Sequence, residues 1–227
     1  MFYRTAKKDE IRAIEKYAIE VIGIPSILLM ENAALKVIKN INLLRRDTFA
    51  IICGVGNNGA DGLAIARNLI SLDKEVHIYL IGSLEEATEE FIFNYKILKR
   101  IDAKISPMET LGDLEDFKRD INKVNTIIDA ITGLGFTGGL EGMAEYMAEI
   151  INRSRIYTIS VDLPSGMEAD QGLVNTIAIN PSLVVTFQYM KEGLVNNKLL
   201  KDCQIVVESI GIPRQAERHI LRQKVNL

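Results

Sequence analysis

Two aspartates stand at the ends of short apolar runs, Asp129 after Ile127-Ile128 and Asp162 after Ser160-Val161. A carboxylate fixed at the end of a strand can transfer protons when burial or hydrogen bonding tunes its pKa. The simpler alternative for Asp162 is that it caps nearby backbone N–H groups, the commoner role for a single aspartate of this kind. Asp162 is therefore a candidate for acid–base chemistry or for local structure, and Asp129 places a second carboxylate at the end of a strand.

A polar, glycine-containing segment runs from Gly54 to Gly62, after the apolar run Phe49–Cys53 and before the helical pattern Leu63–Leu69. Glycines allow a tight turn, and the start of a helix offers unpaired N–H groups and the positive end of its dipole. The segment is neither a GxGxxG nor a GK[ST] motif, so its polar side chains would set specificity. We predict an anion site there, with a simple turn at residues 57–59 as the alternative.

Loops that could enclose a ligand also follow the two aspartates. Five glycines lie between Gly133 and Gly142, and their backbone could wrap a ligand or form a mobile surface loop. After Asp162, Pro164 stiffens the turn that displays Ser165. Lys191 follows a later strand and could assist catalysis, although a lone lysine there is more often a solvated charge.

The three loops together offer an oxygen-only set of ligands: the Asn58 amide, the Asp129 carboxylate and the Ser165 hydroxyl. Such a set suits a hard cation rather than zinc or iron. With one firm charge among them, the interpretation is a monovalent ion. His77 and His219 have no neighbours that suggest a metal site or a triad, and we interpret both as structural; Cys53 and Cys203 are read as reduced thiols.

The elements that would position these residues alternate between short β-rich runs and helical segments. Several runs are apolar on consecutive residues, which is typical of strands buried on both faces of a mainly parallel sheet. The expected fold is a three-layer α/β/α Rossmann-like sandwich around a central, mostly parallel sheet, with two helices before the first strand and another over Glu85–Lys99. The predicted strands are 49–53, 75–81, 103–106, 126–129, 157–162, 183–187 and 204–208.

Composition sets outer limits on the function. A chain of 227 residues fits a single domain over residues 1–227, and a net charge of −3 provides no basic footprint for nucleic acid. The first ten residues contain no apolar signal core, and the apolar stretch Ile22–Met30 is interrupted by Gly23 and Pro25. We therefore expect a cytoplasmic protein with neither membrane nor nucleic-acid partners.

Taken together, these motifs resemble the NAD(P)HX epimerase family, also called the YjeF amino-terminal domain family. The resemblance covers nearly the whole chain and rests on the order and strand-end placement of its motifs. The matching segments are Gly56–Gly62, where the family usually has GNNGGDG, then Asp129–Gly135, Ser160–Gly166, and Thr186-Phe187 with Lys191 and Gly193. The segment Met30–Ala34 is similar to the family's MENAG, a helix near the substrate site.

The resemblance implies roles for individual residues. Asp162 would lie beside the reactive ring as the acid and base, assisted by Lys191, and potassium would be bound by Asn58, Asp129 and Ser165. The remaining substrate-binding positions implied are Asn57, Asn58, Gly59, Ala60, Asp61, Gly133, Leu134, Gly135, Phe136, Thr137, Gly138 and Gly139, together with Asp162. Ala60 and Ala34 replace glycines of the family, and Gly138-Gly139 stands where many members have Arg-Pro.

The implied activity is epimerisation of the R and S forms of hydrated NADH and NADPH (NADHX and NADPHX). This is a repair step that serves a separate, ADP- or ATP-dependent dehydratase specific for the S form. A homodimer is also implied. Two alternatives belong to other classes: a non-catalytic nucleotide- or RNA-associated scaffold of the same fold, and a nicotinamide-dependent dehydrogenase, which would usually carry GxGxxG after its first strand.

Overall fold

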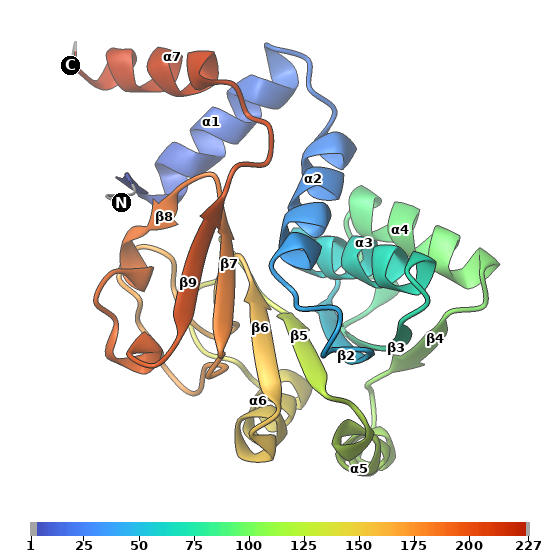
Figure 1. Cartoon of the computed structure of the whole chain (residues 1–227). Coiled ribbons are helices and arrows are strands. Elements are labelled where there is room, and N and C mark those ends of the chain that lie inside the picture. Colours follow the sequence, from blue (N-terminus) through green and yellow to red (C-terminus); the bar gives the residue numbers. More distant parts are fainter. Residues whose placement is uncertain (1–3, 226–227) are drawn as a thin grey trace.

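A seven-stranded sheet forms the centre of the protein (Figure 1). The computed structural model describes the backbone of residues 4–225 and the side chains as far as residue 220. All neighbouring strands of this sheet are parallel. Their order is β4 (Lys104–Pro107), β3 (Glu75–Ile81), β2 (Thr48–Gly54), β5 (Thr126–Ala130), β6 (Tyr157–Val161), β7 (Leu183–Phe187) and β9 (Gln204–Glu208).

The seven predicted strands are thus confirmed to within one or two residues. Their consecutive apolar residues are explained by burial on both faces, and β5 and β7 are buried at every position. Alternate residues of one strand join different cores: Ile51 and Cys53 of β2 face one side of the sheet, whereas Ala50 and Ile52 face the other. Each face therefore needs its own layer of helices.

The helices supply those two layers. On one face lie α2 (Ser26–Lys39), α3 (Asn57–Ser71) and α4 (Glu89–Arg100), and on the other lie α5 (Leu111–Asp120) and α6 (Met143–Ser154). The helices α1 (Lys8–Glu20) and α7 (Arg214–Val225) lie together above β7 and β9, and the rings of Tyr17 and His219 stack between them (Figure 1). The three-layer α/β/α prediction is confirmed.

Short elements complete the chain. The strand β1 (Thr5–Ala6) pairs in parallel with β8 (Met190–Lys191), outside the main sheet. Four 3-10 turns, η1 to η4, occupy Leu84–Glu86, Ile121–Lys123, Glu192–Leu194 and Lys198–Leu200. In the part of the chain that the structure describes, no helix is long and apolar enough to cross a bilayer.

Two helix starts differ from the prediction. The helix α3 begins at Asn57 rather than Leu63, so most of the predicted glycine loop is the first two turns of this helix. The helix α4 begins at Glu89 rather than Glu85, because the Thr88 hydroxyl accepts the Phe91 N–H and caps it, whereas Ser83 caps only the turn η1. Local capping chemistry thus explains the second difference.

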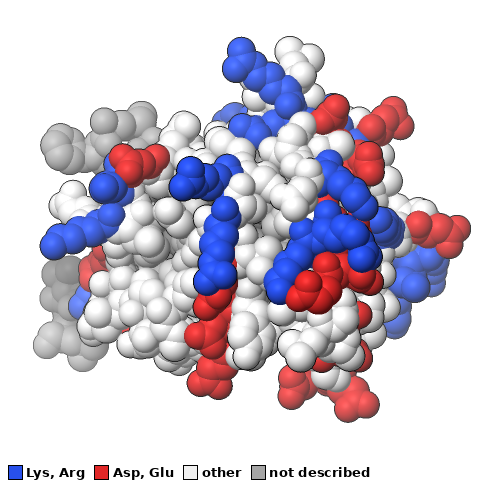
Figure 2. All heavy atoms as spheres, turned by 90° about the horizontal axis from the view of Figure 1, so that it is seen from below, with Lys and Arg blue, Asp and Glu red and all other residues white. Residues whose placement is uncertain are grey.

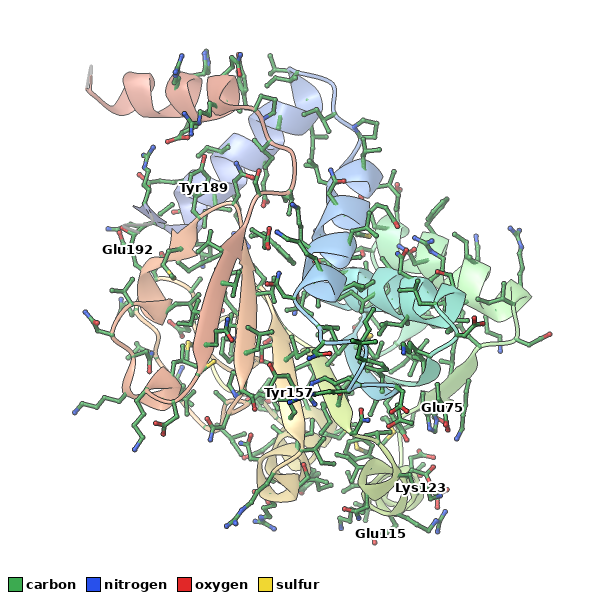
Figure 3. All side chains as sticks on the ribbon, in the orientation of Figure 1. Glu75, Glu115, Lys123, Tyr157, Tyr189 and Glu192 are labelled. Atoms are coloured by element: carbon green, nitrogen blue, oxygen red, sulfur yellow. The ribbon has the colours of Figure 1, made fainter. Side chains whose placement is uncertain are left out.

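The sheet order places a switch point between β2 and β5. From β2 the chain proceeds outward through β3 and β4, and later through β5, β6, β7 and β9 on the other side. Open parallel sheets bind ligands beyond the carboxyl ends of the strands at such a point. Figure 3 shows Tyr157, which begins β6, at the opposite end of the sheet from Tyr189, which follows β7.

His77, interpreted as structural, and the two cysteines lie either away from the switch point or within the core. The Tyr79 hydroxyl is 2.7 Å from His77 Nδ1, and the Ser106 hydroxyl is 2.9 Å from His77 Nε2, so hydrogen bonds occupy both ring nitrogens. Burial lowers the pKa of His77 to about 4. Cys53 is buried and Cys203 half-buried, and both are free thiols.

Candidate active site

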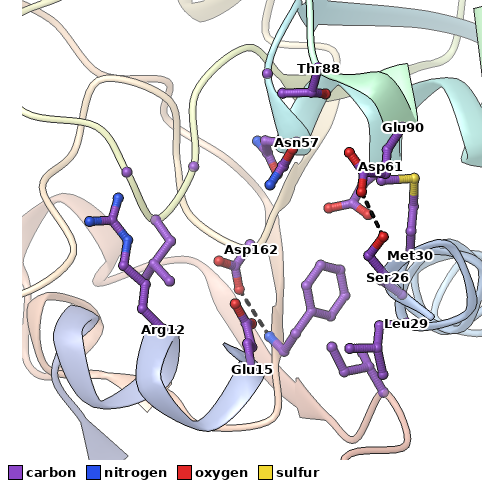
Figure 4. Close-up of a pocket in the computed structure, with 18 of the residues that line it drawn as sticks. Arg12, Glu15, Ser26, Leu29, Met30, Asn57, Asp61, Thr88, Glu90 and Asp162 are labelled. Carbon is purple, nitrogen blue, oxygen red and sulfur yellow. Dashed lines mark hydrogen bonds between the residues drawn. The ribbon is translucent and has the colours of Figure 1, made fainter. Parts of the chain in front are cut away.

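A cavity of about 580 Å³ lies beyond the carboxyl ends of β2, β5 and β6 (Figure 4). The helices α1 and α2 form one side, and the start of α3 and the loop after β5 form the other. The polar residues of its wall are Arg12, Glu15, Ser26, Asn57, Asn58, Asp61, Thr88, Glu90, Thr132 and Asp162; the apolar ones include Leu29, Met30, Ala33, Leu134, Phe136 and Phe187. Its size is within the range of small-molecule sites.

Asp162 follows β6 and points into this cavity. Its backbone is left-handed, with φ of +66°, a conformation that is costly for a residue with a side chain and concentrated at functional sites. Asp162 Oδ1 accepts hydrogen bonds from Phe187 N at 3.0 Å and Thr186 Oγ1 at 3.2 Å, and it forms an ion pair with Lys191 Nζ. These three donors fix the position of the carboxylate in the cavity wall.

Lys191 is 1% exposed, so the alternative of a solvated charge is wrong. The pairing of β8 with β1 holds its backbone, and Lys191 Nζ also donates to Phe187 O at 3.0 Å. A buried ammonium needs such partners, because removing the ion from water without them would cost on the order of several kcal/mol. Lys191 therefore serves Asp162 from behind the cavity wall.

Two further carboxyl groups, Glu15 of α1 and Asp61 of α3, line the same cavity. Desolvation, followed by the charge of Asp162, raises the pKa of Glu15 from 4.5 to about 7, against the opposing effects of Lys191 and Arg12. Desolvation and the charges of Asp162 and Glu15 raise the pKa of Asp61 well above its usual range. The cavity thus combines an ion-paired carboxylate with two carboxyl groups whose pKa values are raised above their ordinary values.

Asp129 lies in β5, beside Ser160 of β6, and is fully buried. Its Oδ2 accepts Ser160 Oγ at 2.7 Å and Ser165 N at 2.9 Å, and its Oδ1 accepts Ser165 Oγ. Desolvation raises the pKa of Asp129 against these hydrogen bonds, and no cationic side chain of the described residues acts on it. A bound cation would offset the cost of keeping this carboxylate ionised.

The predicted ion ligands are brought together around that carboxylate. Ser165 Oγ accepts the Thr132 N–H at 2.9 Å, and Asn58 Nδ2 donates to Thr132 O at 2.7 Å, so Asn58, Asp129 and Ser165 meet at one turn. The atoms available as ligands are oxygens, and only the Asp129 carboxylate carries a full charge. The residues therefore fit a monovalent hard cation.

The start of α3 contributes residues both to the cavity wall and to the predicted ion ligands. Asn57, Asn58 and Asp61 line the cavity, and Gly56, which precedes the helix, provides no side-chain cap for its first N–H groups. Gly59 and Ala60 are buried behind them, and a Cβ at Gly59 would lie 1.6 Å from Gly54 O. Tight packing on β2, rather than a loop conformation, therefore requires glycine at position 59.

The loop after β5 divides into two halves. Gly133, Leu134, Gly135 and Phe136 line the cavity, whereas the predicted substrate-binding residues Thr137, Gly138 and Gly139 lie outside its wall. Gly138 N donates to Glu168 Oε1 at 3.2 Å, and Gly138 O accepts Asn175 Nδ2 at 2.8 Å. The second half of the loop is thus joined to the segment after β6.

Several cavity residues were missed from the sequence, among them Arg12, Glu15, Ser26, Thr88 and Glu90. Ser26 Oγ donates to Glu90 Oε1 at 2.6 Å, a pairing across 64 positions that no local pattern indicates. The spacing of Glu15, in contrast, could have indicated its role. It lies four residues after Ile11 and three before Ala18, on the buried face of α1, where a carboxylate is unexpected.

Three comparisons place this geometry among known proteins. The family described as YjeF-related protein N-terminus matches residues 26–193. An NAD(P)H-hydrate epimerase of Anaerococcus prevotii is 47% identical over 93% of this chain and 96% of its own length. A bifunctional NAD(P)H-hydrate repair enzyme of Methanothermobacter thermautotrophicus is 37% identical over 87% of this chain, which spans 38% of that protein.

Among solved structures, yeast ynu0 superposes with a TM-score of 0.81 over 96% of this chain and 93% of its own. At 22% sequence identity this likeness concerns the fold alone. It extends over the sheet and both helical layers described above.

Proposed function

Because this chain belongs to the family of the YjeF-related protein N-terminus, we propose that it is an NAD(P)H-hydrate epimerase. It is an isomerase that interconverts the R and S forms of NADHX and NADPHX. The observation that carries this function is a cavity at the switch point of the sheet with the ion-paired carboxylate of Asp162 in its wall. The epimerase of Anaerococcus prevotii, similar over nearly its whole length, supports the same activity.

The reaction changes one carbon of the hydrated nicotinamide ring, which carries the hydroxyl and is bonded to the ring nitrogen. The nitrogen lone pair can expel that hydroxyl as water once an acid protonates it, and water can then add to the opposite face of the iminium-like ring. Asp162, held in the cavity wall by Lys191, takes part in these proton transfers. The side of the cavity formed by Asn57, Asn58 and Gly133–Phe136 binds the dinucleotide.

Potassium is part of this proposal. Asn58, Asp129 and Ser165 would hold it, and the cation would neutralise the buried Asp129 carboxylate. The turn built from Thr132 and Ser165 would then keep its shape beside the cavity. The cation is thus proposed to organise the turn, with no part in the proton transfers.

Further parts of the proposal concern partners and location. The S epimer is proposed to pass to a separate ADP- or ATP-dependent dehydratase; relatives named bifunctional NAD(P)H-hydrate repair enzymes support a second repair step. A homodimer and a cytoplasmic location are proposed as well; sedimentation and cell fractionation test them. Figure 2 shows acidic and basic side chains interspersed on the face seen from below, in contrast to the basic surface that nucleic acid would require there.

The test supplies the R epimer of NADHX or NADPHX with an S-specific dehydratase and its nucleotide, and follows the return of reduced-nicotinamide absorbance. Spontaneous epimerisation sets the blank. Acceleration by the protein supports the proposed function. Absence of acceleration with both substrates, from folded protein supplied with potassium, would favour the non-catalytic scaffold.

A further inference from the structure

Glu15 is a carboxyl group of the cavity wall that is coupled electrostatically to Asp162 and that the proposed function has not yet used. It lies on α1, N-terminal to the segment that the family comparison matches. Figure 4 shows its side chain in the cavity beside Asp162, with Arg12 farther out on the same helix. Its spacing from Ile11 and Ala18 places it, half-buried, on the apolar face of α1, where an ionised carboxylate is unfavourable.

Epimerisation through loss and return of water needs a proton donor for the leaving hydroxyl and a proton acceptor for the entering water. One group must carry a proton to give to the leaving hydroxyl, and another must be ionised to accept a proton from the entering water. Asp162 meets the second requirement, since Lys191 Nζ, Phe187 N and Thr186 Oγ1 all donate to its Oδ1. A second group must therefore carry the proton that is given to the leaving hydroxyl.

We propose that Glu15 is the proton donor of the epimerisation and Asp162 its proton acceptor. This inference rests on the proposed function and divides between two residues the acid–base work first expected of Asp162 alone. The contacts of Asp162 with its three donors and the placement of Glu15 beside it in one cavity carry the inference. Pairs of titratable groups whose surroundings push their pKa values apart are the usual mark of such a division.

The Glu15 carboxyl gives its proton to the ring hydroxyl, the C–O bond breaks with the electrons of the ring nitrogen filling the iminium bond, and water leaves. A water molecule then forms a C–O bond on the opposite face, and Asp162 takes its proton. Transfer of that proton from Asp162 back to Glu15 restores the enzyme, and the reverse reaction needs no other group.

The charges around Glu15 explain why it can carry a proton at neutral pH. Desolvation, followed by the charge of Asp162, raises the pKa of Glu15 to about 7, whereas Lys191 and Arg12 act in the opposite direction. Asp61 of α3 also faces this group of charges and is the competing donor. Figure 4 places Asp61 toward Ser26 and Glu90, on the other side of Asp162 from Arg12.

The experiment compares kcat/KM against pH for the wild-type protein and for Glu15→Gln, Asp61→Asn and Glu20→Gln. Glu20 is an exposed residue of the same helix, paired only at 3.9 Å with Lys16, and is the matched control. We expect wild-type activity to fall above about pH 7. Glu15→Gln should lose roughly 100- to 10,000-fold in kcat and lack this alkaline limb.

A binding measurement separates catalysis from structure. A 1,4,5,6-tetrahydronicotinamide dinucleotide, which lacks the ring hydroxyl, should bind Glu15→Gln within about threefold of the wild-type Kd, because the lost proton acts only in the reaction. Near wild-type kcat in Glu15→Gln, or an alkaline limb that disappears in Asp61→Asn instead, would overturn the inference. Inactivity of wild type and Glu20→Gln alike would instead reject the proposed function itself.

Discussion

Asp129 and Asp162 belong to neighbouring parallel strands, yet different partners surround them. Asp129 is enclosed by hydroxyl and N–H donors, and no cationic side chain of the described residues lies beside it, whereas Asp162 forms an ion pair with Lys191 and opens on the cavity. A carboxylate with polar neighbours alone suits a cation, and one with a fixed cation on one side is available for chemistry on the other. In the sequence the two aspartates look alike, because each stands at the end of a strand. Their neighbours in the folded protein distinguish them.

The most severe test of this difference is Asp162→Asn. An amide keeps the shape of the side chain but accepts no proton, so turnover should fall by roughly 100- to 10,000-fold. The measurement is the coupled epimerase assay, with circular dichroism as the check on folding. Because the change leaves the Lys191 charge unpaired, the double variant Asp162→Asn/Lys191→Met controls for stability. Turnover near wild type in either variant would remove Asp162 from the reaction.

Lys191→Met tests the other half of the ion pair. Removing one partner of a buried pair leaves the other charge unpaired, so unfolding free energy should fall by about 3 kcal/mol. Asp162 would also lose the ammonium that holds its Oδ1 in the cavity wall, so turnover should fall as well. Chemical denaturation and the coupled epimerase assay measure these effects. Unchanged turnover in folded Lys191→Met would mean that the ion pair does not position Asp162 for the reaction.

Asp129→Asn examines the region proposed to hold potassium. In the wild type, potassium at tenfold its Kd should stabilise the folded protein by about 1.4 kcal/mol. Melting curves in potassium chloride and in tetramethylammonium chloride at equal ionic strength should therefore differ. The variant should melt at one temperature in both salts. A potassium response that survives in Asp129→Asn would place the cation elsewhere.

The strand-end chemistry could be predicted from the sequence because it follows local rules. Apolar runs gave the strands, and parallel order brought Asn58, Asp129 and Ser165 to one edge. The partner of Asp162 could be proposed only through family resemblance, since 29 positions separate it from Lys191. The position of Glu15 in the cavity wall depends on how α1 packs over the sheet. The helical period puts Glu15 on the buried face of α1, but it does not show which part of the fold that face contacts.

Glu15→Gln should sharpen the comparison through stability as well as activity. The folded pKa of Glu15 is about 7 against 4.5 for the unfolded chain, so the folded state binds more protons between these values. Its contribution is complete below pH 4.5 and is lost as pH rises through 7. Relative to Glu15→Gln, the wild type should lose on the order of 1 kcal/mol between pH 5 and 8, reduced by the partial exposure of this group. Denaturation at both pH values measures it, and equal losses in the two proteins would contradict a raised pKa.

The smallest effect is expected at Ala60, which lies between the residues that α3 gives to each region, Asn58 to the ion ligands and Asp61 to the cavity. Ala60 is fully buried inside the helix and outside the cavity wall, so this alanine in place of the family's glycine fits an ordinary helical position. Ala60→Gly should lower unfolding free energy by about 0.5–1 kcal/mol through backbone entropy, with kcat and KM unchanged. Gly59→Ala is the contrasting variant. Its Cβ would strike Gly54 O, so it should disturb both the potassium response and turnover. A change of KM in Ala60→Gly would show that position 60 approaches the substrate after all, and that the start of α3 does more than hold the two regions apart.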